Sequence, residues 1–375
     1  MNFRINRNRF YSALSIASKA IASNSPVPAL SAFKIEVSKD ALVVTGSDAN
    51  LSIQVTLTNA ADQELSLSVS EPGTIVIDSR YLLDIVKKID SSEIHMEIID
   101  GTLTHFTGQK AEYRINGFRP SEYPAIEFSE PAVKFTLQAE QLQKIIGSIG
   151  FAVSTKDTRP VLTGINMRLS EGKLTCTGTD SYRLARIVLD AEGPEFMVTV
   201  PSKIISEAKN IFAEEKDVVI ALSDKKIQFR TGSVIMQSTL LDGSYPDTER
   251  LIPSSFNSNM VISRHALLAA IDRTSFIRTD NMTIIRMQIN SADDITISCK
   301  SQEIGDYNED IIAVSYDGIP MDISFSGNYM LDALKALSSD NVIIRFTENM
   351  KPFILTNEEG DQRITQLVLP VRTYN

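Results

Sequence analysis

The chain has 375 residues, of which 43 % are hydrophobic, so it is long enough for more than one domain of about 100–200 residues. No stretch reaches the roughly 18 consecutive apolar residues of a membrane span, and the first ten residues lack the apolar core of a secretion signal. Both observations predict a cytoplasmic protein. The net charge of −10, taken alone, argues against a nucleic-acid partner, because phosphates attract basic surfaces.

The chain opens on a strand that leads into an amphipathic helix. Residues 3–6 alternate in polarity, and Phe10, Leu14, Ala17 and Ile21 then follow at helical spacing. The prolines in the next turn end this helix. Period-two alternation and helical spacing then predict strands at 32–37, 41–46 and 51–57, a helix at 79–89, and strands at 93–99, 102–107 and 112–115.

The same order of elements returns twice. The opening strand-helix pattern recurs from Phe135 and from Met260, which lie 132 and 125 residues further on. A shorter relative of it begins at Ile75, Val198 and Ile323. Six copies of one strand-helix unit predict three domains, at residues 1–127, 128–253 and 254–375.

Each half-domain contains one amphipathic helix and about four strands. One helix cannot cover its sheet face alone, so two halves are expected to pair, with their helices side by side on antiparallel sheets. Domains stacked by a constant rotation would place all helices on one face and all sheets on the other. The predicted fold class is α+β.

Although the net charge is negative, the predicted helices carry a surplus of positive charge. Six predicted helix windows carry 12 lysines and arginines against 6 aspartates and glutamates, so the rest of the chain carries −16. If the helices gather on one face, that face is basic and the opposite face is acidic. The windows are 7–22, 79–90, 139–152, 202–213, 263–277 and 327–338.

Cysteines and histidines point to no metal or redox chemistry. Cys176 and Cys299 stand far apart in alternating apolar runs, which predicts buried free thiols. His95, His105 and His265 share no ligand spacing, and no G-x-S-x-G motif accompanies them. No metal or other cofactor is expected.

Several motifs resemble those of the bacterial sliding clamps, the beta subunits of replicative DNA polymerases. The motifs are T-D-S-Y-R-L-A from Thr179, R-P-V-L-T-G from Arg159, L-D-G-S-Y-P-D from Leu241, F-S-G-N-Y-M-L-D-A-L from Phe325 and L-P-V-R from Leu369. The resemblance covers all 375 residues and includes the triple repeat.

That resemblance implies three repeated DNA-clamp domains, with helices on the inner face and antiparallel sheets on the outer face. It implies a head-to-tail homodimer that forms a ring around double-stranded DNA without sequence specificity. The family has no catalytic activity. It confers processivity on the polymerase catalytic subunit and docks the clamp loader and other replication and repair proteins through short motifs.

The resemblance also implies three sets of site residues. Cations are expected to face DNA phosphates, which bind without sequence preference, although ordinary solvated charges remain the alternative for each. The DNA-facing candidates are Arg7, Lys19, Arg80, Lys87, Lys144, Lys156, Arg159, Lys203, Lys209, Arg264, Arg273 and Lys335.

A peptide groove is implied between the second and third domains, with plain core packing as the alternative for its leucines. An apolar cleft with polar rims suits the Leu and Phe side chains of a short extended segment. Tyr182 stands where many relatives have His, and Ser326 where some have Asn, so the preferred motif stays open. The groove candidates are Leu162, Thr179, Ser181, Tyr182, Arg183, Leu184, Pro246, Arg250, Leu251, Ser326, Tyr329, Phe353, Leu367, Leu369, Pro370, Val371 and Arg372.

The dimer contact is implied to join an edge strand of the first domain to the segment that follows the third domain's first helix. Its candidates are Tyr113, Ile115, Phe276, Ile277 and Met282, with an intradomain core as the alternative.

Two other function classes compete with a clamp. An enzyme could use Asp180 as acid, Arg183 as clamp and Tyr182 as donor, but no second carboxylate, nucleophile or phosphate loop accompanies them. A repeat scaffold that binds only proteins would lack the surplus of positive charge on the helices.

Overall fold

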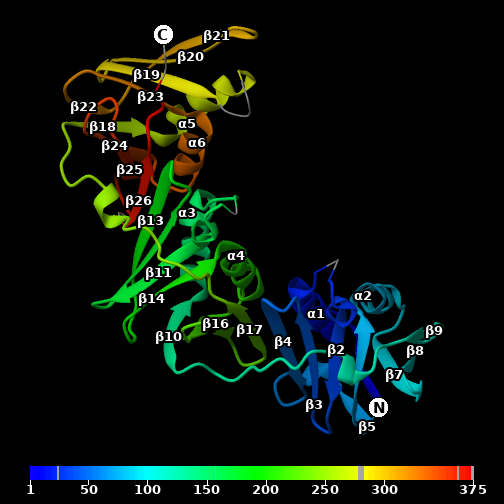
Figure 1. Cartoon of the computed structure of the whole chain (residues 1–375). Coiled ribbons are helices and arrows are strands. Elements are labelled where there is room, and N and C mark those ends of the chain that lie inside the picture. The colour runs from blue at the N-terminus through cyan, green and yellow to red at the C-terminus, as the bar shows by residue number, and fades with distance from the viewer. Residues whose placement is uncertain (23–24, 157, 278–282, 361–362, 373–375) are drawn as a thin grey trace. The chain divides into compact units, whose positions relative to one another are not determined.

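The computed structural model describes residues 1–22, 25–156, 158–277, 283–360 and 363–372. The chain forms two compact units (Figure 1). Unit 1 comprises residues 1–139 and 207–240, and unit 2 comprises residues 140–206 and 241–375. The helix α4 (Ser202–Ile211) runs from unit 2 into unit 1, and α3 (Ala139–Ile149) begins where the first stretch of unit 1 ends.

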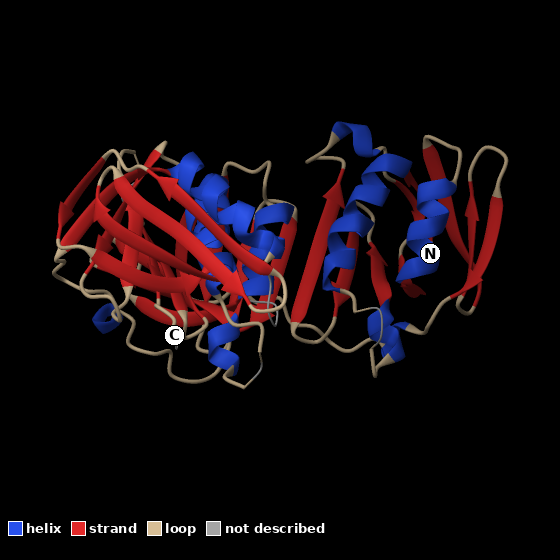
Figure 2. Cartoon of the chain, turned by 90° about the horizontal axis from the view of Figure 1, so that it is seen from above, coloured by secondary structure: helices blue, strands red, loops and turns tan. Residues whose placement is uncertain are grey.

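Unit 1 is built on two antiparallel sheets and two helices. One sheet has the order β5-β1-β7-β8-β9 and the other β10-β15-β16-β17-β4-β3-β2-β6. The helices α1 and α2 lie side by side, with α1 against β3 and β4 and α2 against β2 and β6 (Figures 1 and 2). The elements are β1 (Asn2–Asn6), α1 (Arg7–Ala17), β2 (Ala32–Val37), β3 (Ala41–Ser47), β4 (Leu51–Thr58), β5 (Ser68–Glu71), β6 (Gly73–Asp78), α2 (Ser79–Lys88), β7 (Glu93–Asp100), β8 (Leu103–Thr107), β9 (Glu112–Asn116), β10 (Val133–Gln138), β15 (Asp217–Leu222), β16 (Lys226–Arg230) and β17 (Val234–Thr239).

Unit 2 repeats this plan. Its sheets have the orders β14-β11-β12-β13-β26-β25-β24-β18-β22 and β21-β20-β19-β23, and α5 packs beside α6. The elements are β11 (Gly164–Ser170), β12 (Lys173–Thr179), β13 (Arg183–Asp190), β14 (Phe196–Pro201), β18 (Ser258–Ser263), α5 (Arg264–Arg273), β19 (Ile284–Ser291), β20 (Asp294–Ser301), β21 (Gly305–Ile311), β22 (Ser315–Gly318), β23 (Met321–Ser326), α6 (Gly327–Lys335), β24 (Asn341–Phe346), β25 (Phe353–Asn357) and β26 (Ile364–Val368).

The predicted sixfold strand-helix repeat is confirmed. The pairs are β1–α1, β6–α2, β10–α3, β14–α4, β18–α5 and β23–α6. In α1, α2 and α5 a polar side chain caps the first turn. The Asn6 side chain accepts from Asn8 N at 2.9 Å, Asp78 from Arg80 N at 2.9 Å, and Ser263 from Ala266 N at 3.3 Å.

Gly46 and Gly178 stand at equivalent positions of the repeat, where the end of a helix lies close to a strand. A Cβ atom on Gly46 would lie 2.3 Å from the carbonyl oxygen of Ala17, and one on Gly178 would lie 2.9 Å from that of Ile149. Both contacts would force the backbone to move, so any larger residue would push the helix away from the sheet. This explains why Gly46 and Gly178 recur at the same place in the repeat.

Two sheets continue from one predicted domain into the next, and the sequence did not predict this. The pair β17–β4 joins the second half of domain two to the first half of domain one, with Ser238 opposite Leu51. The pair β13–β26 joins domains two and three, with Arg183 opposite Val368. These joints explain why the chain forms two compact units although it contains three repeats.

Candidate functional site

The β13–β26 joint carries a small apolar cluster in unit 2. Leu184 lies opposite Leu367, and Leu367 also lies opposite Ile354 of β25. These three side chains are buried together, and the partly buried Ile252 and Phe256 pack against them. The cluster therefore lies where the strand β13 meets the segment that connects domains two and three.

A tight turn before β13 shapes one side of this cluster. Asp180 accepts hydrogen bonds from the backbone N–H groups of Tyr182, at 2.9 Å, and Arg183, at 3.0 Å. Ser181 adopts a left-handed φ of 79°, which is uncommon for a residue other than glycine. The Thr179 hydroxyl donates to the carbonyl of Arg183 at 2.6 Å. The turn thereby leaves the side chain of Tyr182 64 % exposed.

Arg183 is fixed on all sides. Its guanidinium donates to Asp180 at 3.0 Å and to Asp332 at 2.6 Å, and it lies over the rings of Tyr329, at 4.5 Å, and Phe151, at 5.2 Å. Burial, and after it the negative charge of Asp180, raises the pKa of Tyr329. Asp180 is thus occupied by Arg183 and by the turn, which leaves no free acid for the enzymatic reading of these residues.

Two other segments supply further predicted groove residues. Pro246, Arg250 and Leu251 are exposed on the connecting segment, and Arg250 pairs with Asp247 at 2.9 Å. Leu369 N donates to the carbonyl of Tyr182 at 3.0 Å, which holds the last described segment along the turn.

The other predicted groove residues have different degrees of burial. Leu162, Thr179 and Ser326 are buried, and Phe353 is fully buried between Phe325 and Phe346. Leu369, Pro370 and Val371 are half-buried, and Arg372 is exposed. Phe353 is therefore a core residue, which cannot contact a ligand at the surface directly.

Sequence reasoning missed several residues of this region: Phe151, Ile252, Phe256, Asp332 and Ile354. Four of them lie outside the motifs that carry the resemblance, and Asp332 lies within the motif that begins at Phe325. Asp332 could have been found from that motif, whereas the aromatic and aliphatic residues carry no signal that separates them from core residues.

The predicted DNA-facing cations fall into two groups. Lys19, Lys87, Lys156, Arg159, Lys203 and Lys335 are exposed and form no ion pair within the described part of the chain. Lys144 is also exposed, and Lys209 is half-buried. The amines of Lys19, Lys87, Lys156, Lys203 and Lys335 and the guanidinium of Arg159 remain available to a polyanion.

The remaining arginines are engaged within the protein. Arg7 donates to the carbonyl of Val86 at 2.9 Å and to that of Lys87, at the end of α2, and Arg264 donates to the carbonyl of Ser339 at 2.8 Å. Arg80 pairs with Asp78 at 3.3 Å, and Arg273 pairs with Glu309. The hydrogen bond from Arg273 holds the pKa of the Glu309 carboxyl below its usual range.

The predicted dimer residues lie at two sheet ends. Tyr113 and Ile115 are half-buried on β9, the last strand of its sheet in unit 1. Phe276 is 56 % exposed and packs edge-on against Tyr307 of β21, the last strand of its sheet in unit 2, at 6.4 Å. Ile277 is buried. Met282 lies outside the described residues.

The thiols match the sequence expectation, since Cys176 and Cys299 are both buried and free. Burial raises the pKa of the Cys176 thiol. Among the described residues, no group of three or more His, Cys, Asp or Glu side chains is arranged to hold a metal ion. None of the helices in the described ranges combines the length and the apolar character that crossing a membrane requires.

Six strand-helix units on antiparallel sheets that continue from one repeat into the next are the fold of the DNA-clamp class of proteins. Three family models of the DNA polymerase III beta subunit match the chain: the N-terminal domain over residues 1–127, the central domain over 136–247 and the C-terminal domain over 249–372. The chain therefore belongs to the DNA polymerase III beta subunit family, the beta sliding clamps.

Individual relatives agree with this assignment over their whole lengths. The beta sliding clamps of Staphylococcus aureus and Staphylococcus epidermidis are each 35 % identical over 378 residues, with 100 % of both chains covered. The solved DNA polymerase sliding clamp of Bacillus subtilis has a TM-score of 0.95 at 35 % identity, with 100 % of both chains covered. A clamp from Pseudomonas aeruginosa solved bound to griselimycin has a TM-score of 0.92 at 25 % identity, again with 100 % of both chains covered.

Proposed function

We propose that two copies of this chain form a head-to-tail ring that encircles double-stranded DNA and keeps the replicative polymerase on its template. The ring acts in the cytoplasm without catalysis or a cofactor. Its three clamp domains span residues 1–127, 128–253 and 254–375, so that six equivalent domains complete the ring.

The open sheet edges are the observation that carries this proposal. Within the chain, β4 pairs with β17 and β13 pairs with β26, and each joint connects the first half of one domain to the second half of the next. In the repeat, β21 of domain three is equivalent to β4 and β13, and β9 of domain one is equivalent to β17 and β26. The strand expected to pair with β21 is therefore β9 of another copy. Both β21 and β9 are terminal strands of their sheets in the described chain.

An open edge is a template for another strand, and proteins seldom leave one uncovered. Pairing β21 of one copy with β9 of a second copy satisfies both edges twice and closes the assembly. Phe276 beside β21, and Tyr113 and Ile115 on β9, would then be buried at the joint.

The exposed cations support weak, non-specific contact with DNA. Each phosphate contact contributes about −0.9 to the slope of log affinity against log salt, and such binding allows a protein to slide. Enclosure makes weak contact sufficient, because the ring cannot leave the duplex sideways. Lys19, Lys87, Lys156, Arg159, Lys203 and Lys335 are the leading contacts, since none of them is committed to an ion pair within the described chain.

The apolar cluster at Leu184, Ile354 and Leu367, with the exposed Tyr182 and Leu251 beside it, supports a docking groove. Short extended motifs of the polymerase catalytic subunit, the clamp loader and repair proteins are the proposed occupants.

Retention on DNA of different topology tests the ring. The assembly, loaded on nicked circular duplex, is expected to stay bound in a salt wash and to be lost once the circle is cut. Equal loss from circular and linear DNA contradicts encirclement and favours the alternative of a protein-only scaffold. Sedimentation is expected to give about twice the chain mass of 41.5 kDa.

A further inference from the structure

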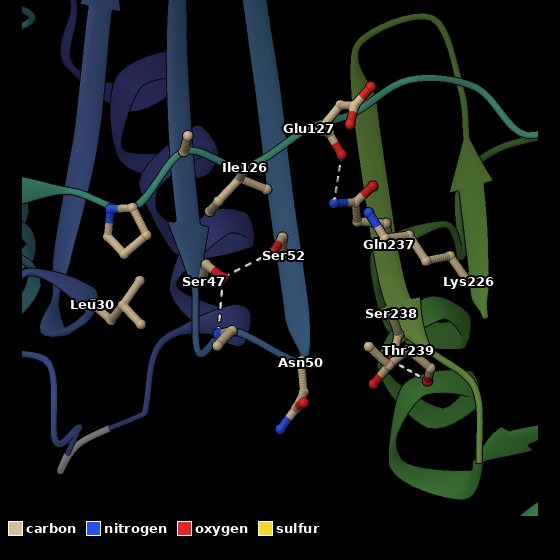
Figure 3. A pocket seen from close by; sticks show the side chains of 13 residues that line it. Leu30, Ser47, Asn50, Ser52, Ile126, Glu127, Lys226, Gln237, Ser238 and Thr239 are labelled. Atoms are coloured by element: carbon tan, nitrogen blue, oxygen red, sulfur yellow. Dashed lines mark hydrogen bonds between the residues drawn. The ribbon is translucent and has the colours of Figure 1, made fainter. Parts of the chain in front are cut away.

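The β4–β17 joint in unit 1 contains a slot of about 220 Å³ (Figure 3). One wall comes from β3, β4 and β17, and the other from Leu30 and the segment 124–126 that leaves domain one. The slot lies at the place in the repeat that corresponds to the groove of unit 2.

Strand register makes the correspondence residue by residue. Gln237 lies opposite Ser52, as Leu367 lies opposite Leu184 in the other joint. Ala49 has a φ of 78°, beside the 79° of Ser181. The same strained turn and the same strand pairing therefore frame both cavities, while the side chains at the matched positions have changed from leucines to hydroxyl and amide groups.

The polar wall, formed by Ser47, Ser52 and Gln237, is held by hydrogen bonds within the chain and has donor hydrogens that these bonds do not use. Ser47 and Ser52 are buried with their hydroxyl oxygens 2.8 Å apart, and Ser47 also accepts from Ala49 N at 3.0 Å. Because each hydroxyl has one hydrogen, this pair uses only one of its two hydrogens within the described chain.

The amide of the buried Gln237 has one spare hydrogen for the same reason. Its oxygen accepts from Gln228 at 3.0 Å, and one of its two N–H bonds donates to the carbonyl of Glu127 at 3.0 Å. Figure 3 shows the hydrogen bond between the Gln237 amide and the Glu127 carbonyl. The polar wall therefore has hydrogen-bond donors without an acceptor in the described chain, and a ligand that supplies acceptors would complement it.

The opposite wall and the rim add two further requirements. Leu30, Pro124 and Ile126 form an apolar side, large enough for one aliphatic side chain. Lys226 is exposed at the rim and forms no ion pair in the described ranges, so its ammonium can meet a ligand carboxylate, although the exposed Glu127 also lines the slot. A ligand that complements all three features has carbonyl oxygens, a short aliphatic side chain and a negative charge.

We propose that the slot binds a short extended peptide segment whose carbonyls face Ser52 and Gln237 and whose carboxylate meets Lys226. An extended peptide presents carbonyls on one side and side chains alternately, which matches a slot with one polar wall and one apolar wall. The segment is acidic, whereas the proposed occupant of the unit 2 groove is apolar. This site does not depend on DNA encirclement or on the groove.

Methyl NMR of the full-length protein with labelled isoleucines tests the slot, using three probe peptides. These are acetyl-Ala-Leu-Ser-Asp-amide, the same peptide ending in Asn-amide, and acetyl-Ala-Leu-Ser-Ala with a free terminal carboxylate. The Asp peptide is expected to shift the Ile126 methyl saturably and to leave Ile354, which reports on the groove, unmoved. The Asn peptide is expected to bind about tenfold more weakly or less.

Lys226→Glu is expected to weaken the Asp peptide to the level of the Asn peptide. Lys225→Glu makes the same charge change at the neighbouring exposed lysine, which does not line the slot, and is expected to have little effect. Tighter binding of the free carboxylate than of the Asp peptide identifies a chain terminus as the ligand, and the reverse identifies an internal acidic residue.

Three results overturn the proposal: no saturable shift at Ile126 with millimolar peptide, equal loss with both lysine variants, or a shift at Ile354 in place of Ile126. None of these bears on DNA retention, so failure of the slot and failure of the ring are distinguishable.

Discussion

The two sheet joints within the chain share a frame and differ in chemistry. At β13–β26 the matched pair is Leu184 and Leu367, and at β4–β17 it is Ser52 and Gln237. The first joint buries its pair in an apolar cluster. At the second joint, Ser52 is hydrogen-bonded to Ser47, and Gln237 to the carbonyl of Glu127.

The difference shows that strand pairing holds the domains together whatever side chains fill the cavity beside it. The backbone ladder is the same in kind at both joints, so the cavity is free to change from apolar to polar without loss of the joint. One repeated frame can therefore offer two surfaces of different preference.

The largest expected effect follows from placing a charge at the matched positions. Leu184→Asp should abolish binding of a peptide that carries Leu and Phe, by about a hundredfold or more, because an unpaired carboxylate would stand in the apolar cluster. Ser52→Asp at the other joint should leave that peptide's affinity unchanged. Fluorescence anisotropy with acetyl-Ala-Leu-Ala-Leu-Phe-amide, labelled at one end, measures both. Unaltered binding to the Leu184 variant, with the dimer intact, would reject the groove.

Arg183 and Leu51, which are also matched, sharpen the comparison further. Arg183→Met removes the cation that Asp180 and Asp332 share and should lower the free energy of unfolding of unit 2 by about 2–3 kcal/mol. Leu51→Met conserves volume and should cost unit 1 less than about 1.5 kcal/mol. Hydrogen exchange of amides in β13 and β4 reports each unit separately. Equal losses would mean that the ion network does not stabilise its joint.

Much of the fold could be predicted because the local signals agree with it. The predicted strand 32–37 coincides with β2, and the predicted helix 79–89 ends one residue beyond α2. Alternation and capping act over a few residues, so the sequence contains them directly. The short edge strands β5 and β22 were not predicted, because four residues carry too little pattern.

The joints and the true partners of the arginines could not be predicted. Strand pairs such as β4–β17 join segments almost 200 residues apart, and alternation does not specify a neighbour. The family resemblance implies Arg7 and Arg264 as DNA contacts, and in the structure both donate to helix-end or loop carbonyls. A sequence shows where arginines stand. Which backbone carbonyls their guanidinium groups bond to depends on which segments meet in the fold.

The hydrogen bonds of Gln237 at the β4–β17 joint should make a smaller contribution to the free energy of unfolding. Gln237→Leu leaves the carbonyl of Glu127 and one N–H of Gln228 without their partner, at a cost of about 1–3 kcal/mol to unit 1. Replacing both glutamines with leucine should cost less than the sum of the two single changes, because the double variant no longer buries a lone amide. Chemical denaturation of the three variants measures the coupling. Additive costs would show that the two amides act independently.

The smallest effect is expected at β21, where Arg273 pairs with Glu309 at the surface of the chain. The folded-state pKa of Glu309 is lowered, chiefly by its hydrogen bond from Arg273, so its stabilising contribution is complete above the unfolded value of about 4.3 and is lost as the pH falls through the lower folded value. Solvent screens an exposed pair, so Arg273→Gln should change the thermal midpoint of unit 2 much less than Arg183→Met at neutral pH. It should also remove a small acid-dependent loss between pH 5 and the folded pKa. A change as large as that of Arg183→Met would mean that pairing of β21 with β9 of a second copy shields the Arg273–Glu309 pair from solvent.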